Sequence, residues 1–183
     1  MEIVLLKKDQ RVATQRALRA LDSGGVLLFP TDTVYGIGGD ALRRNVVFRI
    51  RRLKKRPSGK PFPWLVSDLV MAKRYGRFSK EAERYARSVW PGAVTIVVRV
   101  PSGRGTRAFR VPKHRWLRKL IAAYGRPLIG TSANRSGDSP ARTARRAGNM
   151  LSGADLLIDG GTCAGKVSRV LDCTGRATRV LRR

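Results

Sequence analysis

The sequence predicts a globular domain of the mixed α/β class, and three observations carry that prediction. The chain of 183 residues is about the size of one domain and can bury a core without disulfides or a structural metal. Hydrophobic residues make up 42% of it, which is typical of globular proteins. Its apolar residues follow helical spacing in some segments and form short β-branched runs in others. We therefore expect one domain over residues 1–183, with no additional C-terminal domain.

A short strand and a helix open the chain. The apolar residues at 3–6 indicate the strand, and Gly24 and Gly25 end the helix. Asp9 is placed to cap this helix, whose apolar side carries Val12, Ala13, Ala17, Ala20 and Leu21.

The rest of the chain is organised around the stretch from Phe29 to Ala41. The apolar run at 26–29 indicates a buried strand, which stops at Pro30 and is followed by threonines, an acid and several glycines. Ligands of open α/β sheets bind at such strand ends, where glycine lets them approach main-chain donors. An ordinary strand-to-helix turn is the alternative, and spacing alone does not decide between the two.

A basic loop over 54–61 follows a helix with one apolar stripe, formed by Val46, Val47, Ile50 and Leu53. Two prolines in the loop prevent continued helix, and it carries Lys54, Lys55, Arg56 and Lys60. Such cations can hold a triphosphate, because Arg offers a planar fork and Lys a point charge. A solvated basic linker is the alternative reading of a charge run.

Strands and helices continue to alternate beyond the loop. Ser67 and Ser79 are the expected caps of two helices, over 68–75 and 79–88. Further helices are expected over 116–124 and 140–150, and strands over 64–66, 93–100, 109–112, 127–129, 156–159, 167–172 and 178–181. A turn over 173–176 is expected to join the last two strands as a hairpin.

A corner of small polar residues, 130–137, follows the strand at 127–129 and reads Gly-Thr-Ser-Ala-Asn-Arg-Ser-Gly. Hydroxyls and an amide at a strand end can bind a hydroxylated ligand, a ribose or a phosphate. A turn rich in Ser and Asn is the alternative.

Charge is the extreme feature of the composition. The 39 Lys and Arg residues against 12 Asp and Glu give a net charge of +27, which favours contact with polyanions such as RNA. Arg outnumbers Lys by 29 to 10, so an arginine-rich genome is an alternative source of the charge.

The sequence argues against several other classes of site. It has two cysteines, Cys163 and Cys173, in no metal-binding spacing, and a single histidine, His114. We expect no protein-bound metal and no Ser-His-Asp triad, and the few cysteines fit a reducing cytoplasm. No segment has the signal-peptide pattern or the roughly 20 apolar residues that cross a bilayer, so we expect no membrane partner.

Five motifs, in order and at compatible spacing, closely resemble the YrdC/TsaC family of threonylcarbamoyl-AMP synthases. They are residues 30–38, the loop 54–61, Trp90-Pro91-Gly92 with Thr95, residues 110–114 and residues 131–137. The resemblance implies a twisted, open mixed sheet with flanking helices and a concave basic surface, of the YrdC-like, DHBP synthase-like kind.

The resemblance also implies an activity. L-threonine, bicarbonate and ATP would be joined into threonylcarbamoyl-AMP and pyrophosphate, with Mg²⁺ accompanying the triphosphate. Other proteins would then transfer the threonylcarbamoyl group to the adenosine beside the anticodon of tRNAs that read codons beginning with A.

The resemblance also implies which residues form the site, because positions in the motifs of this sequence match the family's site residues. Lys54 and Arg56 match the catalytic Lys-x-Arg at the nucleotide phosphates, with Lys60, Thr95 and Arg182 as further nucleotide contacts. Thr33 and Ser168 match substrate contacts. Ser132 and Asn134 match the Ser-x-Asn pair, which binds nucleotide or amino acid.

The chain departs from the family pattern in places. Lys55 lies where a glycine is often found, and Arg169 follows Ser168 where a threonine is common. A module that binds double-stranded RNA or tRNA, in rRNA or ribosome maturation, is the alternative function. A carbamoyl-adenylate domain of the hydrogenase-maturation type is a third, but the zinc-finger cysteines that accompany it are absent from the sequence.

Overall fold

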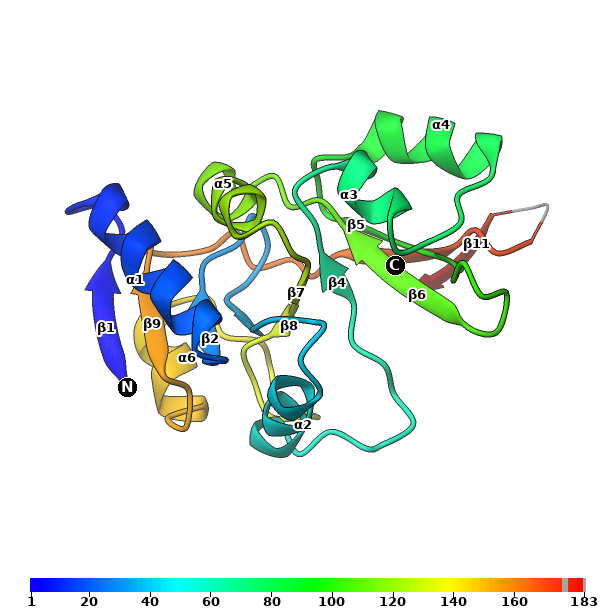
Figure 1. Ribbon diagram of the computed structural model, residues 1–183. Helices are drawn as coiled ribbons and strands as arrows, with labels where there is room; N and C mark the ends of the chain where they lie inside the picture. The colour runs from blue at the N-terminus through cyan, green and yellow to red at the C-terminus, as the bar shows by residue number, and fades with distance from the viewer. Residues whose placement is uncertain (176–177, 183) are drawn as a thin grey trace.

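A computed structural model describes residues 1–175 and 178–182 and has a mixed α/β fold (Figure 1). Its strands form two sheets, with β1, β9 and β2 in one part of the molecule and β5, β6 and β11 in the other. The described strands are β1 (Glu2–Leu5), β2 (Leu27–Phe29), β3 (Gly36–Gly38), β4 (Trp64–Leu65), β5 (Val94–Arg99), β6 (Thr106–Arg110), β7 (Leu128–Ile129), β8 (Thr131–Ser132), β9 (Leu156–Asp159), β10 (Arg169–Asp172) and β11 (Arg179–Arg182).

The helices cover the faces of these sheets, and the residues that they bury are apolar or small. Ala13, Ala17 and Leu21 of the first helix are fully buried, whereas Val12, predicted on the same side, is exposed. The helices are α1 (Gln10–Asp22), α2 (Arg44–Leu53), α3 (Leu69–Lys73), α4 (Lys80–Val89), α5 (Arg115–Tyr124) and α6 (Ala144–Met150). None of them is long and apolar enough to cross a membrane, as far as the described residues go.

Both sheets are mixed. The five-stranded sheet has the order β1-β9-β2-β3-β8, in which β9 runs parallel to β1 and β2 while β3 is antiparallel to β2 and β8. The six-stranded sheet has the order β11-β10-β5-β6-β4-β7, with parallel pairs at β10–β5 and β4–β6. The mixed α/β class is therefore confirmed, although the strands divide into two open sheets where we expected one.

The sequence did not predict strand β3, because two of its three residues are glycines, which are depleted in strands. The close packing around Gly36 and Gly38 explains why both positions are glycine. A Cβ built on Gly38 would lie 1.9 Å from the carbonyl oxygen of Ile129, and one on Gly36 would lie 2.6 Å from the ring of Phe29. Only glycine lets β3 lie this close to its neighbours.

Several predicted element boundaries also need correction. Asp68, not Ser67, caps α3 by accepting the amide of Met71 at 2.7 Å, and Ser67 instead donates to the Asp68 carboxylate. The last helix begins at Ala144, capped by Thr143, four residues later than expected. Strand β6 covers 106–110, earlier than the predicted 109–112.

Other local predictions are confirmed. Asp9 accepts the amides of Arg11 and Val12 at the start of α1, Ser79 caps α4, and Gly125 ends α5 with a left-handed φ of 74°. The last two strands pair antiparallel as a hairpin, and position 176 of its predicted turn lies outside the described residues.

Candidate active site

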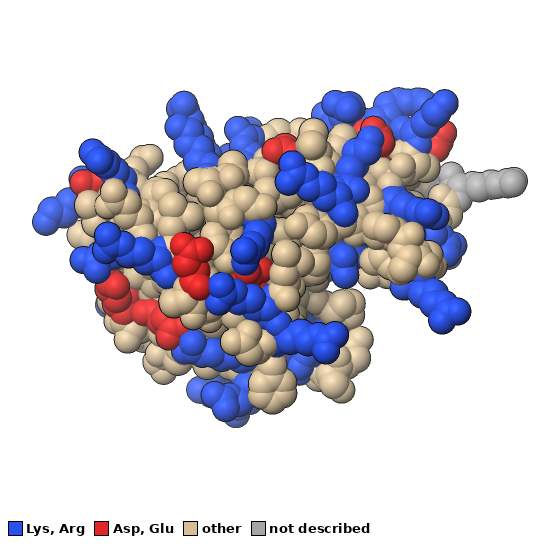
Figure 2. Space-filling model, in the orientation of Figure 1, with Lys and Arg blue, Asp and Glu red and all other residues tan. Residues whose placement is uncertain are grey.

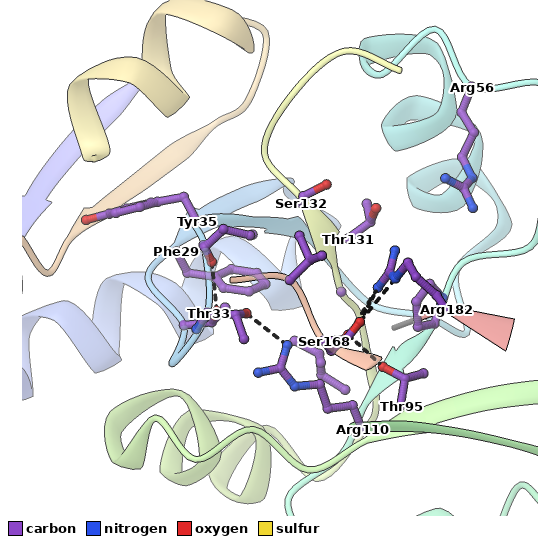
Figure 3. Close-up of a pocket in the computed structure, with 17 residues that line it drawn as sticks. Phe29, Thr33, Tyr35, Arg56, Thr95, Arg110, Thr131, Ser132, Ser168 and Arg182 are labelled. Carbon is purple, nitrogen blue, oxygen red and sulfur yellow. Dashed lines mark hydrogen bonds between the residues drawn. The ribbon is translucent and has the colours of Figure 1, made fainter. Parts of the chain in front are cut away.

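A cavity lies between the two sheets, and both contribute to its wall (Figure 3). Its free space, counted out to the solvent at the mouth, is about 670 Å³. Six of the residues predicted for the site line it, namely Thr33, Arg56, Thr95, Ser132, Ser168 and Arg182. The end of β2, the basic loop and the small polar corner therefore meet at one place.

Thr33 belongs to a chain of hydrogen bonds on one side of the cavity. Its hydroxyl lies 2.8 Å from the hydroxyl of Thr31 and accepts from Nη1 of Arg110 at 3.0 Å. The Thr31 hydroxyl donates to the carbonyl of Val34 at 2.7 Å, so its proton is already used and Thr33 is the donor between the two. The orientation of the Thr33 hydroxyl is thus fixed before any ligand binds.

Arg110 is a buried cation in the same wall, 7% exposed. Its guanidinium forms an ion pair with Asp32 at 2.8 Å and donates through Nε to the carbonyl of Gly92 at 2.9 Å. Burial lowers the pKa of Arg110 and the charge of Asp32 opposes this effect, but an arginine stays charged in either case. The sequence motif included Arg110 without giving it a role, and the signal that could have found it is a charge directly after the buried Phe109 of β6.

A second group of contacts fixes Ser168 in the cavity wall. Its hydroxyl lies 3.0 Å from that of Thr95, and Arg182 donates to its backbone carbonyl through Nε at 3.1 Å and Nη2 at 2.8 Å. Figure 3 shows Thr95 and Arg182 converging on Ser168. The pairing of β10 with β5 and β11 brings these three residues together.

Arg56 completes a set of three guanidinium groups around the cavity. It lies over the ring of Phe62 at 4.9 Å and donates to the carbonyls of Lys60 and Pro61. Burial, followed by the charges of Arg51 and Arg182, lowers its pKa. Arg56, Arg110 and Arg182 line the cavity together, and no acid is among its described lining residues. Such a site favours polyanionic ligands.

Three predicted site residues do not line the cavity. The Lys54 side chain is 2% exposed and its Nζ donates to the backbone carbonyls of Ser132 and Asn134. The Asn134 amide donates to the carbonyls of Arg135 and Asp138, and its Oδ1 is buried without a partner among the described residues. Lys60 is exposed. The phosphate and ligand roles of these three residues stay predictions.

The described residues include no group of three or more His, Cys, Asp or Glu side chains that could hold a metal ion. Both cysteines are free and buried. Burial raises the pKa of the Cys163 and Cys173 thiols, so neither cysteine is activated as a thiolate nucleophile.

Comparison with known proteins decides the family. Residues 19–183 match the model of the Sua5/YciO/YrdC family. The description of this family model reads "Telomere recombination". The chain belongs to this family. The resemblance read from the motifs is therefore confirmed, and the cavity between the sheets is a candidate active site of a Sua5/YciO/YrdC protein.

Family members of different lengths are similar to the chain. A threonylcarbamoyl-AMP synthase of Thiobacillus denitrificans is 36% identical over 168 residues, which are 83% of this chain and 86% of the relative. The crystal structure of Pyrococcus abyssi Sua5 complexed with L-threonine has a TM-score of 0.92 and 31% identity, and the match covers all of this chain but 57% of Sua5. Escherichia coli YciO gives a TM-score of 0.86 at 28% identity, covering 96% of this chain and 90% of YciO.

Proposed function

We propose that the chain is a threonylcarbamoyl-AMP synthase, which makes threonylcarbamoyl-adenylate and pyrophosphate from L-threonine, bicarbonate and ATP. The observation that supports this most is the cavity where three arginines and several fixed hydroxyls meet. It occurs in a chain 36% identical to an enzyme of that name, and the structurally similar P. abyssi protein was crystallised with L-threonine.

The chemistry needs positioning and charge compensation more than a protein nucleophile. Bicarbonate takes up a proton and loses water to give carbon dioxide. The threonine amine attacks the carbon dioxide and loses a proton as the carbamate forms, so the two proton transfers balance. A carbamate oxygen then attacks the α-phosphorus of ATP, and the bond to pyrophosphate breaks. Fixed cations stabilise the negative charge that develops on the phosphate oxygens.

We propose that the site has two ends. At the phosphate end we place Arg56 and Arg182, with Thr95 near them and the exposed Lys60 of the loop beside the part of the triphosphate that lies outside the cavity wall. At the amino-acid end we place Thr33 and Arg110, because the guanidinium is buried, charged and bonded to the Thr33 hydroxyl. In this proposal Ser132 contributes a hydroxyl between the two ends, Ser168 contributes one beside Thr95 and Arg182, and Asn134 acts from the corner that carries Ser132.

Mg²⁺ enters with ATP in this proposal. Asp32, which lies between the lining residues Thr31 and Thr33, is already paired with Arg110, so the triphosphate oxygens supply the ligands that Mg²⁺ prefers. We further propose that the product passes to the proteins that transfer it to tRNA, and that this takes place in the cytoplasm.

The test is pyrophosphate release in the presence and absence of each substrate. We expect release from ATP only when both L-threonine and bicarbonate are present. Arg56→Ala should lower kcat/KM by about 100-fold or more, because it removes a cation from the phosphates. Arg52→Ala, an exposed neighbour on α2, is the matched control.

Two results would count against the proposal at different levels. Release that proceeds equally well without threonine or bicarbonate would refute the activity. Normal turnover by Arg56→Ala in an enzyme that needs all three substrates would refute only the phosphate assignment.

The alternative, an RNA-binding module, rests on net charge. In Figure 2 Lys and Arg are spread over the whole visible face, above both sheets, with small groups of acids among them. This distribution does not mark one track for a nucleic acid. RNA contact stays a prediction beside the enzymatic one.

A further inference from the structure

We propose that Lys54 is a positioning residue that holds the backbone of the corner Ser132–Ser136 against the active-site cavity and acts on the reaction through that corner. The proposal rests on the function proposed above. It differs from the role that the sequence motif predicts for Lys54, which is a direct contact with phosphate.

Lys54 holds the corner through both its side chain and its backbone. Its Nζ donates to the carbonyl of Ser132 and, at 2.7 Å, to that of Asn134, while its own carbonyl accepts the amide of Ser136 at 2.9 Å. One residue therefore makes three hydrogen bonds to three positions of one short segment. As the residue that ends α2, Lys54 also fixes where the corner lies relative to that helix.

The corner is held from its other side by the central stretch of the chain. Ser132 pairs with Gly36 between β8 and β3, and the amide of Ala133 donates to the carbonyl of Tyr35 at 2.7 Å. The corner thus lies between β3 and Lys54. Because its carbonyls at 132 and 134 are bonded to Lys54, the Ser132 side chain keeps its place in the cavity wall.

The residue type fits this task. The ammonium has three N–H donors and no planar constraint, and the carbonyl contacts compensate part of its lost hydration. Burial, and next the charge of Arg56, lower the pKa of Lys54 to about 8. A neutral amine still has two N–H groups, one for each carbonyl, so the hold on the corner does not require the charge.

The most direct test of this proposal compares Lys54→Met with the control variant Lys55→Met. Both remove an ammonium at almost constant length, but Lys55 is exposed, and its side chain has no hydrogen bond to the corner among the described residues. In ligand-free protein we expect the Ser136 amide to exchange with solvent at least about 10-fold faster in Lys54→Met, because the corner that carries this amide is no longer held against the backbone carbonyl of residue 54. Backbone chemical shifts of 132–136 should move as well. Lys55→Met should match the wild type in both measurements.

Steady-state kinetics then separates the two roles. A displaced corner should raise KM for threonine and for ATP together and lower kcat. A raised KM for ATP alone, with unchanged exchange and shifts in the ligand-free corner, would overturn the proposal in favour of direct phosphate contact. A wild type without threonine-dependent and bicarbonate-dependent turnover would refute the proposed function, but the exchange measurement would still decide the role of Lys54.

A double-mutant comparison provides a second criterion. Asn134→Ala loosens the same corner by removing its bonds to the carbonyls of Arg135 and Asp138. If Lys54 acts through the corner, the combined loss of kcat/KM is clearly smaller than the product of the single losses. Independent, multiplying losses would contradict the proposal. Should Lys54→Met fail to fold, Lys54→Gln takes its place; its planar amide is one bond shorter than the lysine chain and does not reach both carbonyls as the amine does, so we expect smaller changes in the same direction in every measurement.

Discussion

Buried charged side chains in this protein are stabilised by contacts of different kinds. Asp40 is fully buried, and its carboxylate accepts the amide of Leu42 at 2.8 Å and the hydroxyl of Tyr124 at 2.9 Å. Arg110 is paired with an acid, whereas Lys54 is bonded to neutral carbonyls. A buried acid or cation requires hydrogen-bond or ion-pair partners of this kind, since an unpaired buried charge strongly destabilises a fold.

Asp40→Asn should therefore destabilise the fold by about 2–4 kcal/mol, since the amide cannot accept from all the donors around it and carries no charge. Arg126 and Arg43, which lie 3.2 Å and 3.5 Å from the carboxylate, would also lose their counter-charge. Urea unfolding at neutral pH measures the effect. Arg126→Gln is the control, because the Arg126 side chain is 51% exposed and such a pair contributes at most about 1 kcal/mol. Equal effects of the two changes would contradict this account.

The lowered pKa of Lys54 makes the free energy of unfolding depend on pH. Its pKa is about 8 in the folded protein against the ordinary 10.5 of a lysine, so between these values the unfolded chain binds the proton and the folded chain does not. The free energy of unfolding should then rise with pH across this window. Relative to Lys54→Met, the wild type should gain about 1–2 kcal/mol between pH 7 and pH 9.5. A difference between the two proteins that stays constant with pH would show that the ammonium is not perturbed.

At the level of residues, sequence patterns predicted much of the cavity wall. Thr33, Arg56 and Ser132 come from separate motifs, and each adjoins a strand or loop that the patterns located. Arg110 was not assigned, because its importance depends on burial and on Asp32, 78 positions away in the chain. The charge directly after Phe109 is a local signal for Arg110 itself, but one sequence gives no local signal for its pairing with Asp32.

Among the elements, the segment 160–168 connects the two sheets and carries Ser168 to the cavity. The hydroxyl of Tyr35 donates to the carbonyl of Gly161 at 2.8 Å and accepts the amide of Gly160 at 3.0 Å. Farther along, the amide of Gly165 donates to the carbonyl of Thr33 at 2.7 Å. In Figure 3 the Tyr35 hydroxyl points away from the other labelled side chains, which agrees with a role in holding this segment.

Tyr35→Phe should reduce stability by about 1–2 kcal/mol, because one change leaves a carbonyl and an amide without their partner. It should also raise KM for threonine, since the start of the segment that carries Ser168 is released. Thermal unfolding and steady-state kinetics measure the two effects. Tyr85→Phe, at a half-buried position on α4, is the matched control. A stable variant with normal kinetics would mean that the segment does not depend on this hydroxyl.

Element prediction succeeded where one side chain sets a boundary and failed where packing sets it. Asp9 and Ser79 begin their helices as predicted, because an N-cap is a local contact. Strand β3 was missed because its glycines are required by the close approach of Phe29 and Ile129, and these residues become neighbours only in the folded chain. Ser67 and Asp68 are both good caps, and the sequence alone does not choose between them.

For the whole molecule, the charge of +27 predicts association with RNA that weakens steeply as salt is added. With six or more phosphate contacts, affinity for tRNA should fall by about 1,000-fold or more between 50 and 200 mM salt. Fluorescence anisotropy with a labelled tRNA measures this. The same titration with a single-stranded polyanion of matched length shows whether tRNA is preferred. Affinity that hardly changes with salt would mean that the charge does not drive binding.

The arrangement into two sheets is the feature of the whole molecule that the sequence could not supply. Alternating strands and helices indicate the α/β class, but several strands here have only two or three residues, and their partners lie far apart in the chain. Strand β4, for example, pairs with β6 and β7. Which sheet each short strand joins depends on the total packing of the two cores, not on its own residues.

The shared cavity wall has a consequence for how substrates affect the folded protein. Phe29 and Ser132 come from one sheet and Thr95 and Arg110 from the other, so a molecule held there contacts both at once. Binding then resists separation of the two halves as well as local opening of either. Saturated with nucleotide and amino acid, the enzyme should melt at a higher temperature in one sharp transition, with neither half loosening before the other.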